Sequence, residues 1–181
     1  MILPIYTYGN AILRKVTEPI TADYPNLKEL VDNMYETMVH AEGVGLAAPQ
    51  IGLAIRLFVV DLAPLKEEHP DLGDFKVTMI NPEILEESEE EVAYDEGCLS
   101  VPGISETVVR PEYIKIRYFD IDFNEHILEL DDFKARVVQH EYDHLEGHLF
   151  TDRIKPLRRQ LLKSKLTNIA KGKAECKYKI K

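Results

Sequence analysis

VVQHEYDHLEGHLF, residues 137–150, places two histidines four positions apart, with a glutamate directly after the first. Residues four apart in an α-helix lie on one face about one turn along, so His140 and His144 can offer ring nitrogens to one metal ion. Glu141 is next to the first of them, close enough to reach a water on the ion without being a ligand. The stretch therefore predicts a metal-binding helix around which the rest of the fold is arranged.

The flanking segments predict an α+β fold. Apolar residues recur at helical spacing over residues 27–38, whereas LFVVDL (57–62) is a mostly apolar run typical of a buried strand. Residues 76–85 and the alternating stretch 106–130 predict further strands, and the helix with the histidines is expected over residues 132–147, with Asp131 or Asp132 as its N-cap. The predicted fold has antiparallel or mixed sheets around a central HExxH helix, with an N-terminal helix and a basic C-terminal helix.

Turn-forming and charged residues subdivide these strands. Asn81–Pro82 is expected to break the strand that contains it, and a turn is expected near Phe123 and Asn124. The acidic cluster EESEEE (86–91) is expected to be a solvated turn or an edge strand. Because no repeat or linker is visible, residues 1–181 are expected to form a single catalytic domain, with 153–181 as its basic helix and tail.

The composition is that of an ordinary globular protein, with 45% apolar and 30% charged residues. No stretch approaches the ~18 apolar residues that a membrane span needs. The opening MILPIYTYGN lacks the basic region and the cleavage site of a signal peptide, so a cytoplasmic location is expected. With only two cysteines, Cys98 and Cys176, no disulfide framework is expected, and either thiol is free for metal binding or catalysis.

The net charge of −10 conceals an asymmetry along the chain. Residues 1–152 hold 11 Lys and Arg against 31 Asp and Glu, which gives −20, whereas residues 153–181 hold 11 against 1, which gives +10. A basic segment of this kind is a candidate for contact with nucleic acid or another anionic surface. The simpler interpretation is a solvated helix followed by a frayed end.

Two histidines do not complete a catalytic site, which normally has three protein ligands and an open position for water. The metzincin motif requires a histidine where this chain has Phe150, and a thermolysin-like site needs a downstream glutamate, for which only Glu175 in a lysine-rich segment remains. Cys98, among the turn-forming residues of DEGCLSVPG, is the stronger candidate, because a thiolate is a good ligand for zinc or ferrous iron. Taken alone, such a cysteine is more often a small buried hydrophobe than a ligand, but beside an HExxH pair with no other third ligand the order is reversed.

Two neutral imidazoles and one thiolate would leave a divalent ion with a net charge of about +1, able to lower the pKa of bound water toward neutrality. Glu141 would take the proton of that water and later pass one to a leaving nitrogen. The oxyanion formed by the attack needs preorganised donors, and the Gln50 side chain and the Leu99 backbone N–H are the candidates. The predicted reaction is hydrolysis of a carbonyl compound without a covalent intermediate.

Three segments together resemble the motifs of the peptide deformylase family, in the same order. They are GVGLAAPQIG (43–52), EGCLSVPG (96–103) and QHEYDHLEG (139–147). The stretch GNAILRKVTEPI (9–20) is also similar to the N-terminal region of that family. The resemblance extends to about residue 155 and is far more specific than one HExxH motif.

The resemblance implies a role for each matching residue. The implied metal ligands are Cys98, His140 and His144. Glu141 is the implied general acid/base, and Gln50 and the Leu99 amide would stabilise the oxyanion. Glu96 is expected to pair with Arg110.

The resemblance also implies a substrate, the N-formyl-methionyl end of a newly made bacterial or organellar protein, and formate and a free amino terminus as products. The implied cofactor is one divalent ion, Fe²⁺ in cells, which Zn²⁺, Ni²⁺ or Co²⁺ can replace. An extended peptide would lie along residues 43–46, close to the backbone of Val44 and Gly45. Val44, Phe133 and Val137 are candidates for the methionine pocket, although core packing would explain each of them equally well.

The sequence departs from the family pattern at two positions. Ser105 stands where some bacterial members have an arginine, and Arg136 stands where an apolar pocket residue is common, which predicts a more polar pocket rim. The segment 153–181 matches the family only as a basic helix. Because nascent chains emerge at the ribosome, this segment is a candidate for binding ribosomal RNA through phosphate contacts.

Two other functions are compatible with an HExxH helix. A small metallopeptidase would cut internal peptide bonds, whereas a deformylase releases only formate. A metal-stabilised binding module on the ribosome would need a fourth protein ligand, for which Asp143 and His148 are the nearest candidates. Asp143 is turned by about 100° from its neighbour on the helix, which favours a hydrogen bond behind a ligand over a bond to the metal.

Overall fold

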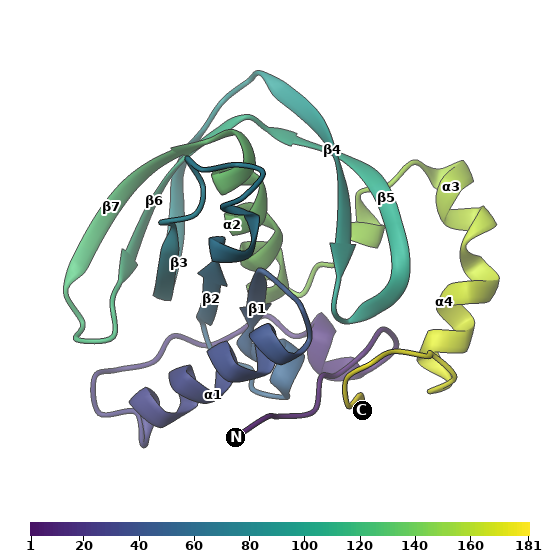
Figure 1. The fold of residues 1–181 in the computed structure, drawn as a ribbon, viewed down its shortest axis with the longest axis horizontal. Helices are drawn as coiled ribbons and strands as arrows, with labels where there is room; N and C mark the ends of the chain where they lie inside the picture. Colours follow the sequence, from purple (N-terminus) through teal and green to yellow (C-terminus); the bar gives the residue numbers. More distant parts are fainter.

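The computed structural model describes residues 1–181, and its largest element is a five-stranded antiparallel sheet in the order β1-β2-β3-β6-β7 (Figure 1). A separate two-stranded hairpin, β4–β5, curves beside it. The strands are β1 Gly45–Ala47, β2 Leu57–Asp61, β3 Lys76–Glu87, β4 Glu91–Cys98, β5 Val101–Pro111, β6 Tyr113–Phe119 and β7 Glu125–Asp131. The predicted α+β class is confirmed, and the turns expected at 86–91 and near Phe123 separate β3 from β4 and β6 from β7.

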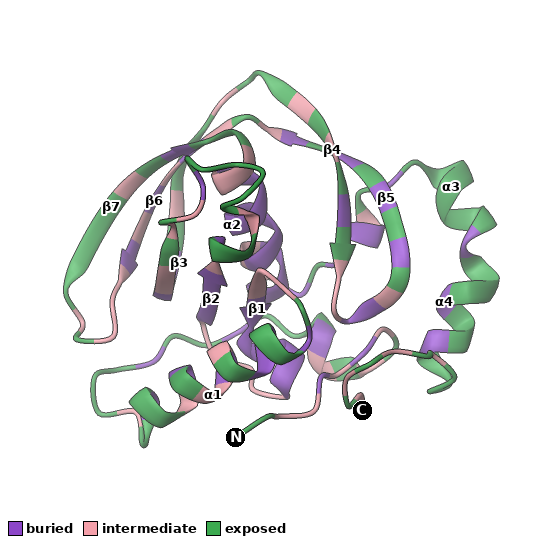
Figure 2. Cartoon of the chain, viewed as in Figure 1, coloured by how far each residue is buried: buried purple, intermediate pink, exposed green.

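The helix with the two histidines is α2, Asp132–Leu145, which follows its N-cap Asp131 and lies between the sheet and the hairpin (Figure 1). Its apolar side packs into the core beneath the sheet, where Val138 and Leu145 meet Phe58 of β2. Most of its other residues are also buried although they are polar (Figure 2). Buried polar groups need partners, so this side of the helix already indicates a functional site.

The expected break in β3 at Asn81–Pro82 is instead a bulge within one continuous strand. The register with β6 shifts between Ile80 and Glu83, and Asn81 adopts a positive φ of 49°. The Asn81 side chain accepts a hydrogen bond from the Ile20 N–H at 2.9 Å and donates one to the Ile20 carbonyl at 2.7 Å. These two bonds satisfy the polar groups at the bulge, so the strand continues beyond the proline.

A second core lies under the N-terminal helix α1, Leu27–His40. Met34 and Met38 of this helix pack with Leu46 of β1 and Val59 of β2, so the strand nearest the site is fixed from below. None of the helices combines the length and the apolar character needed to cross a membrane. Short 3-10 helices occupy η1 Ala11–Arg14, η2 Ala48–Ile51, η3 Ala63–Leu65 and η4 Phe150–Asp152.

The C-terminal region is two short helices, α3 Pro156–Leu161 and α4 Lys163–Ala170, where the sequence predicts one. Leu162, between them, is buried with Leu166 against β5 residues such as Val108, while the outer faces are exposed (Figure 2). Beyond α4 the chain turns back toward its own beginning, where Ile180 pairs with Ile5 in a parallel bridge. This returning segment brings the last residues close to the site described next.

Candidate metal centre

Cys98, His140 and His144 converge as the sequence predicts, with one potential ligand atom from each lying within 4.8 Å of the other two. Cys98 is the last residue of β4, at the tip of the hairpin, and the two histidines lie one turn apart on α2. The Cys98 Sγ lies 3.4 Å from Nε2 of His144. The hairpin tip and the helix face therefore form the two sides of one potential coordination site.

The three side chains fit a divalent ion by their donor types and by what holds them. Nδ1 of His140 bonds to Oε1 of Glu96 at 2.8 Å, which leaves Nε2 of that ring for a metal. His144 directs Nε2 to the same place, and its Nδ1 is buried without a hydrogen-bond partner. A thiolate with two imidazoles is a donor set that suits zinc and ferrous iron. No fourth protein ligand joins the group, and Asp143 instead accepts hydrogen bonds from Arg110 and Arg153.

Glu96 is the hub of a buried network behind His140. It accepts two hydrogen bonds from Arg110, at 2.7 and 2.9 Å, and one from Arg136 at 2.6 Å. Burial opposes the charged form of Glu96, but hydrogen bonds from Arg110 and His140 outweigh it and lower the pKa of this carboxyl. Glu96 is thus a fixed anion that orients the His140 ring.

Arg136 does not contribute to a polar pocket rim, which corrects the expectation from its sequence position. Its side chain is only 3% exposed and points to Glu96 and to the backbone of the hairpin. It donates to the carbonyl oxygens of Val108 at 2.9 Å and Val92 at 2.6 Å. The guanidinium therefore ties α2 to both strands of the hairpin that carries Cys98.

The same surroundings give the two histidines opposite proton affinities in the metal-free protein. Burial lowers the pKa of His144, and the neighbouring His140 lowers it further. For His140, burial opposes the charged form, but hydrogen bonds to Cys98 and Glu96 outweigh it and raise the pKa. His140 therefore favours its protonated form, and metal binding at its ring would displace a proton.

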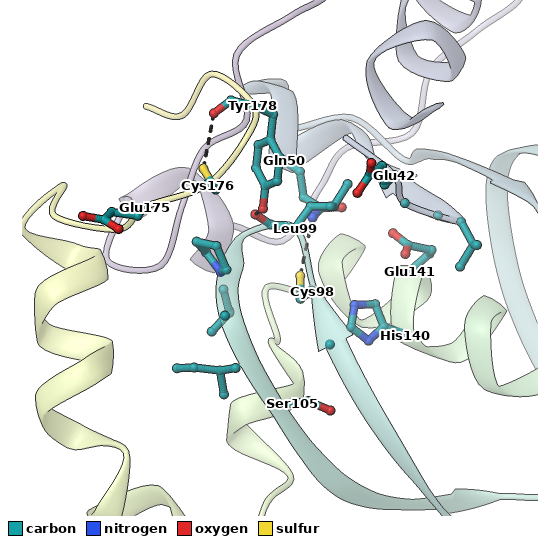
Figure 3. Close-up of a pocket in the computed structure, with 18 residues that line it drawn as sticks. Glu42, Gln50, Cys98, Leu99, Ser105, His140, Glu141, Glu175, Cys176 and Tyr178 are labelled. Atoms are coloured by element: carbon teal, nitrogen blue, oxygen red, sulfur yellow. Dashed lines mark hydrogen bonds between the residues drawn. The ribbon is translucent and has the colours of Figure 1, made fainter. Parts of the chain in front are cut away.

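Glu141 reaches the same pocket from α2, opposite the backbone of β1 (Figure 3). A Cβ added to Gly45 would lie 2.3 Å from Oε1 of Glu141, so glycine is required for this close approach. Burial raises the pKa of Glu141 to about 7, and its Oε2 is buried without a partner. A carboxyl group with these properties is suited to exchange protons near neutral pH.

Gln50 and Leu99 lie on the other side of the cysteine (Figure 3). The Gln50 side chain accepts a hydrogen bond from the Ala47 N–H at 2.9 Å, which fixes its amide NH₂ toward the pocket. That NH₂ lies 3.5 Å from Cys98 Sγ and donates to Ser100 Oγ at 3.1 Å. The structure thus brings both expected oxyanion donors beside the candidate metal ligands.

The candidate methionine-pocket residues are divided between two environments. Val44 lines the pocket of about 510 Å³ in front of Glu141 and also packs against the core cluster that contains Val137. Phe133 packs against the same cluster and makes an edge contact with Tyr94, but neither it nor Val137 lines this pocket. Their assignment to substrate binding stays a prediction. Ser105 does line the pocket.

Sequence reasoning missed one wall of this pocket. The C-terminal residues Glu175, Cys176 and Tyr178 line it together with Glu42 (Figure 3). No periodicity or motif marks these positions, because they reach the site only through the return of the chain after α4. Lys177 lies 3.6 Å from Glu42 in an exposed ion pair, which adds little to the stability of this wall.

The chain is similar to known proteins along nearly its whole length. A sequence model of the polypeptide deformylase family matches residues 2–160. The peptide deformylase of Flavobacterium psychrophilum is 53% identical over 188 residues that cover 100% of this chain and 97% of the relative. The solved peptide deformylase of Thermus thermophilus is 40% identical with a TM-score of 0.85, covering 95% of this chain and 99% of that one. For the structure from Legionella pneumophila the identity is 35%, the TM-score is 0.84, and the coverage is 97% and 99%.

Proposed function

Because this chain belongs to the polypeptide deformylase family, a family of metal-dependent hydrolases that remove the N-formyl group from newly made polypeptides, we propose how its own residues carry out that reaction. The proposal rests on one observation, the convergence of Cys98, His140 and His144 beside a buried, unpaired Glu141. We propose that the three residues hold the divalent ion and that the whole chain acts as one catalytic domain in the bacterial cytoplasm.

A divalent ion held by Cys98, His140 and His144 would supply Lewis acidity, which would make the attacking water more acidic and polarise the formyl oxygen. Glu141 accepts the proton of the attacking water and delivers a proton to the methionine nitrogen as the carbon–nitrogen bond breaks. Formate and a free amino terminus leave. The Gln50 amide and the Leu99 N–H donate to the oxygen that carries the developing negative charge.

The substrate backbone pairs with β1, which is the edge strand of its sheet. One side of this strand is bonded to β2, and the segment from Gly43 to Gly45 borders the pocket on the other side. An extended peptide added there places its formyl end next to Glu141, because Gly45 touches that carboxylate. In this proposal the methionine side chain packs against Val44, which Phe133 and Val137 support from the core cluster behind it.

The metal in cells is Fe²⁺ in this proposal, with Zn²⁺, Ni²⁺ or Co²⁺ able to occupy the site. All four ions accept a thiolate and two imidazoles, so supply in the cell decides which of them is bound.

Purified without oxygen, the protein is expected to contain close to one metal ion per chain and to release formate from a formyl-Met-peptide. Removal of the metal by a chelator should abolish formate release, and Fe²⁺ or Ni²⁺ should restore it. Elemental analysis and a formate assay make these measurements. An unformylated peptide is the control, and cleavage of its internal bonds would instead favour a metallopeptidase.

We also propose that the basic segment 153–181 contacts the ribosome through RNA phosphates. Lys163 and Lys171, which are both exposed, line one groove together with Arg159 where α3 and α4 meet the body of the protein. Deleting the segment would also remove its own residues Leu166 and Ile169 from the core, so binding and stability would change together.

Replacing Lys163 and Lys171 by glutamine should weaken ribosome binding and make it less dependent on salt. Each lost phosphate contact should reduce the slope of log affinity against log salt by roughly 0.7–0.9. Co-sedimentation between roughly 50 and 200 mM salt would measure this slope. The matched control replaces Lys66 and Lys134, outside this segment, by glutamine. Equal binding by the two double variants would refute the phosphate contacts.

A further inference from the structure

The C-terminal tail, defined here as residues 174–181, is built into the reaction pocket. Backbone hydrogen bonds fasten it to the first strand-like segment of the chain, from the Ile5 N–H to the Lys179 carbonyl at 2.9 Å and from the Lys181 N–H to the Ile5 carbonyl at 2.8 Å. That segment is itself bonded to the site, because the Tyr6 N–H donates to the Gln50 carbonyl at 2.8 Å. The tail thus has a fixed place at the pocket wall.

From this wall, Tyr178 points to the hairpin tip (Figure 3). Its hydroxyl donates a hydrogen bond to the Leu99 carbonyl oxygen at 2.7 Å, across 79 positions of sequence. The Tyr178 side chain is half-buried and packs against the core cluster that lies under α1. Its ring is therefore held in place before any substrate arrives.

Several other bonds that hold the hairpin tip reach Ser100, the residue after Leu99. The Tyr8 N–H donates to the Ser100 carbonyl at 2.8 Å, and the Ser100 hydroxyl donates to the Tyr6 carbonyl at 2.7 Å. The Leu99 side chain packs against Gly43, where an added Cβ would lie only 2.7 Å from it. The hydrogen bond from Tyr178 is thus the one described contact that fixes the carbonyl of Leu99 itself.

We propose that Tyr178 is a positioning residue for deformylation, which fixes the Leu99 carbonyl and so limits rotation of the Leu99 backbone, whose N–H faces the developing oxyanion. The inference rests on the proposed role of the Leu99 N–H. A donor of this kind lowers the barrier only if it is aimed before the reaction begins. Without the hydroxyl, the Leu99 carbonyl would bond to mobile water, and freer rotation about the Leu99 backbone bonds would let the Leu99 N–H sample more orientations.

The test is Tyr178→Phe, which removes one oxygen and keeps the ring. We expect kcat for formate release to fall roughly 10-fold, a part of the 10²–10³-fold that loss of an oxyanion donor costs. KM should stay within about twofold, because the donor acts on the transition state more than on bound substrate. Backbone amides of residues 97–101 should exchange hydrogen faster in the variant, in both the metal-loaded and the metal-free protein.

The matched control is Tyr35→Phe, which also removes a half-buried hydroxyl. The Tyr35 hydroxyl, on α1, lies 3.1 Å from Oγ1 of Thr78 on β3. The Tyr35→Phe variant should leave kcat and the exchange of residues 97–101 unchanged. A Tyr178→Phe protein with unaltered kcat and unaltered hydrogen exchange would overturn the proposal. A higher KM at constant kcat would also overturn it, because that result would mean that Tyr178 only forms part of the wall that contacts substrate. If the wild-type protein released no formate, the proposed function would fail, whereas faster exchange in the variant would still show that Tyr178 holds Leu99.

Discussion

Glu141→Gln is expected to keep its metal and lose formate release by on the order of 10³-fold, because the water and the leaving nitrogen then lack their proton carrier. The substitution keeps the shape of the side chain beside Gly45. It should not lower the free energy of unfolding, because the carboxylate it replaces is buried with an unpaired Oε2 and has its pKa raised to about 7. Metal analysis, a melting curve and a formate assay on one sample make the comparison.

The matched control for this variant is Glu146→Gln. Glu146 caps the end of the same helix and pairs with Arg56 at 2.7 Å on its outer side. The Glu146→Gln variant should retain both its metal and its activity. Substantial turnover by Glu141→Gln with bound metal would mean that another group carries the proton.

Cys98→Ala is expected to lose the metal and, with it, all measurable formate release. The loss of a direct ligand should weaken metal binding by more than the roughly 10–100-fold typical of the residues that only orient ligands. The fold should survive, because Cys98 is at a hairpin tip and only half-buried. Dialysis against buffer with trace metal, followed by elemental analysis, measures the retained ion.

Cys176→Ala controls for the loss of a thiol. Cys176 also lines the pocket, but it lies outside the group of three convergent ligands and donates to the Tyr178 carbonyl at 3.2 Å. This variant should retain its metal. If Cys98→Ala bound metal as tightly as Cys176→Ala, the proposed ligand set would be wrong.

The features that the sequence predicted are those with a local signature. The i, i+4 spacing of His140 and His144 determines which helix face they share, and the alternating strands follow from side-chain periodicity. The sequence indicates Cys98 because two histidines leave a ligand position open and alternatives such as Phe150 cannot fill it. The periodicity of helices and strands shows which side chains share a face, and it can be read from about a dozen consecutive residues.

Features created by distant contacts were not predictable in this way. Arg136 looks like a polar residue at a pocket rim, yet it is buried because Glu96, forty positions away, accepts its hydrogen bond. The division between α3 and α4 arises at Leu162, whose side chain is drawn into the core against β5. Tyr178 reaches Leu99 only because Ile180 pairs with Ile5, a pairing that no local pattern announces.

The hub at Glu96 also constrains how this protein can evolve. Replacing the carboxylate would leave the buried guanidinium of Arg136 without a carboxylate partner and that of Arg110 with Asp143 alone, and removing one partner of a buried pair costs about 3–5 kcal/mol. Changing either arginine would in turn leave Glu96 with a single guanidinium partner behind the His140 ring that it orients. Substitutions at these positions are therefore epistatic. We expect Glu96, Arg110 and Arg136 to be replaced together in evolution, and not one at a time.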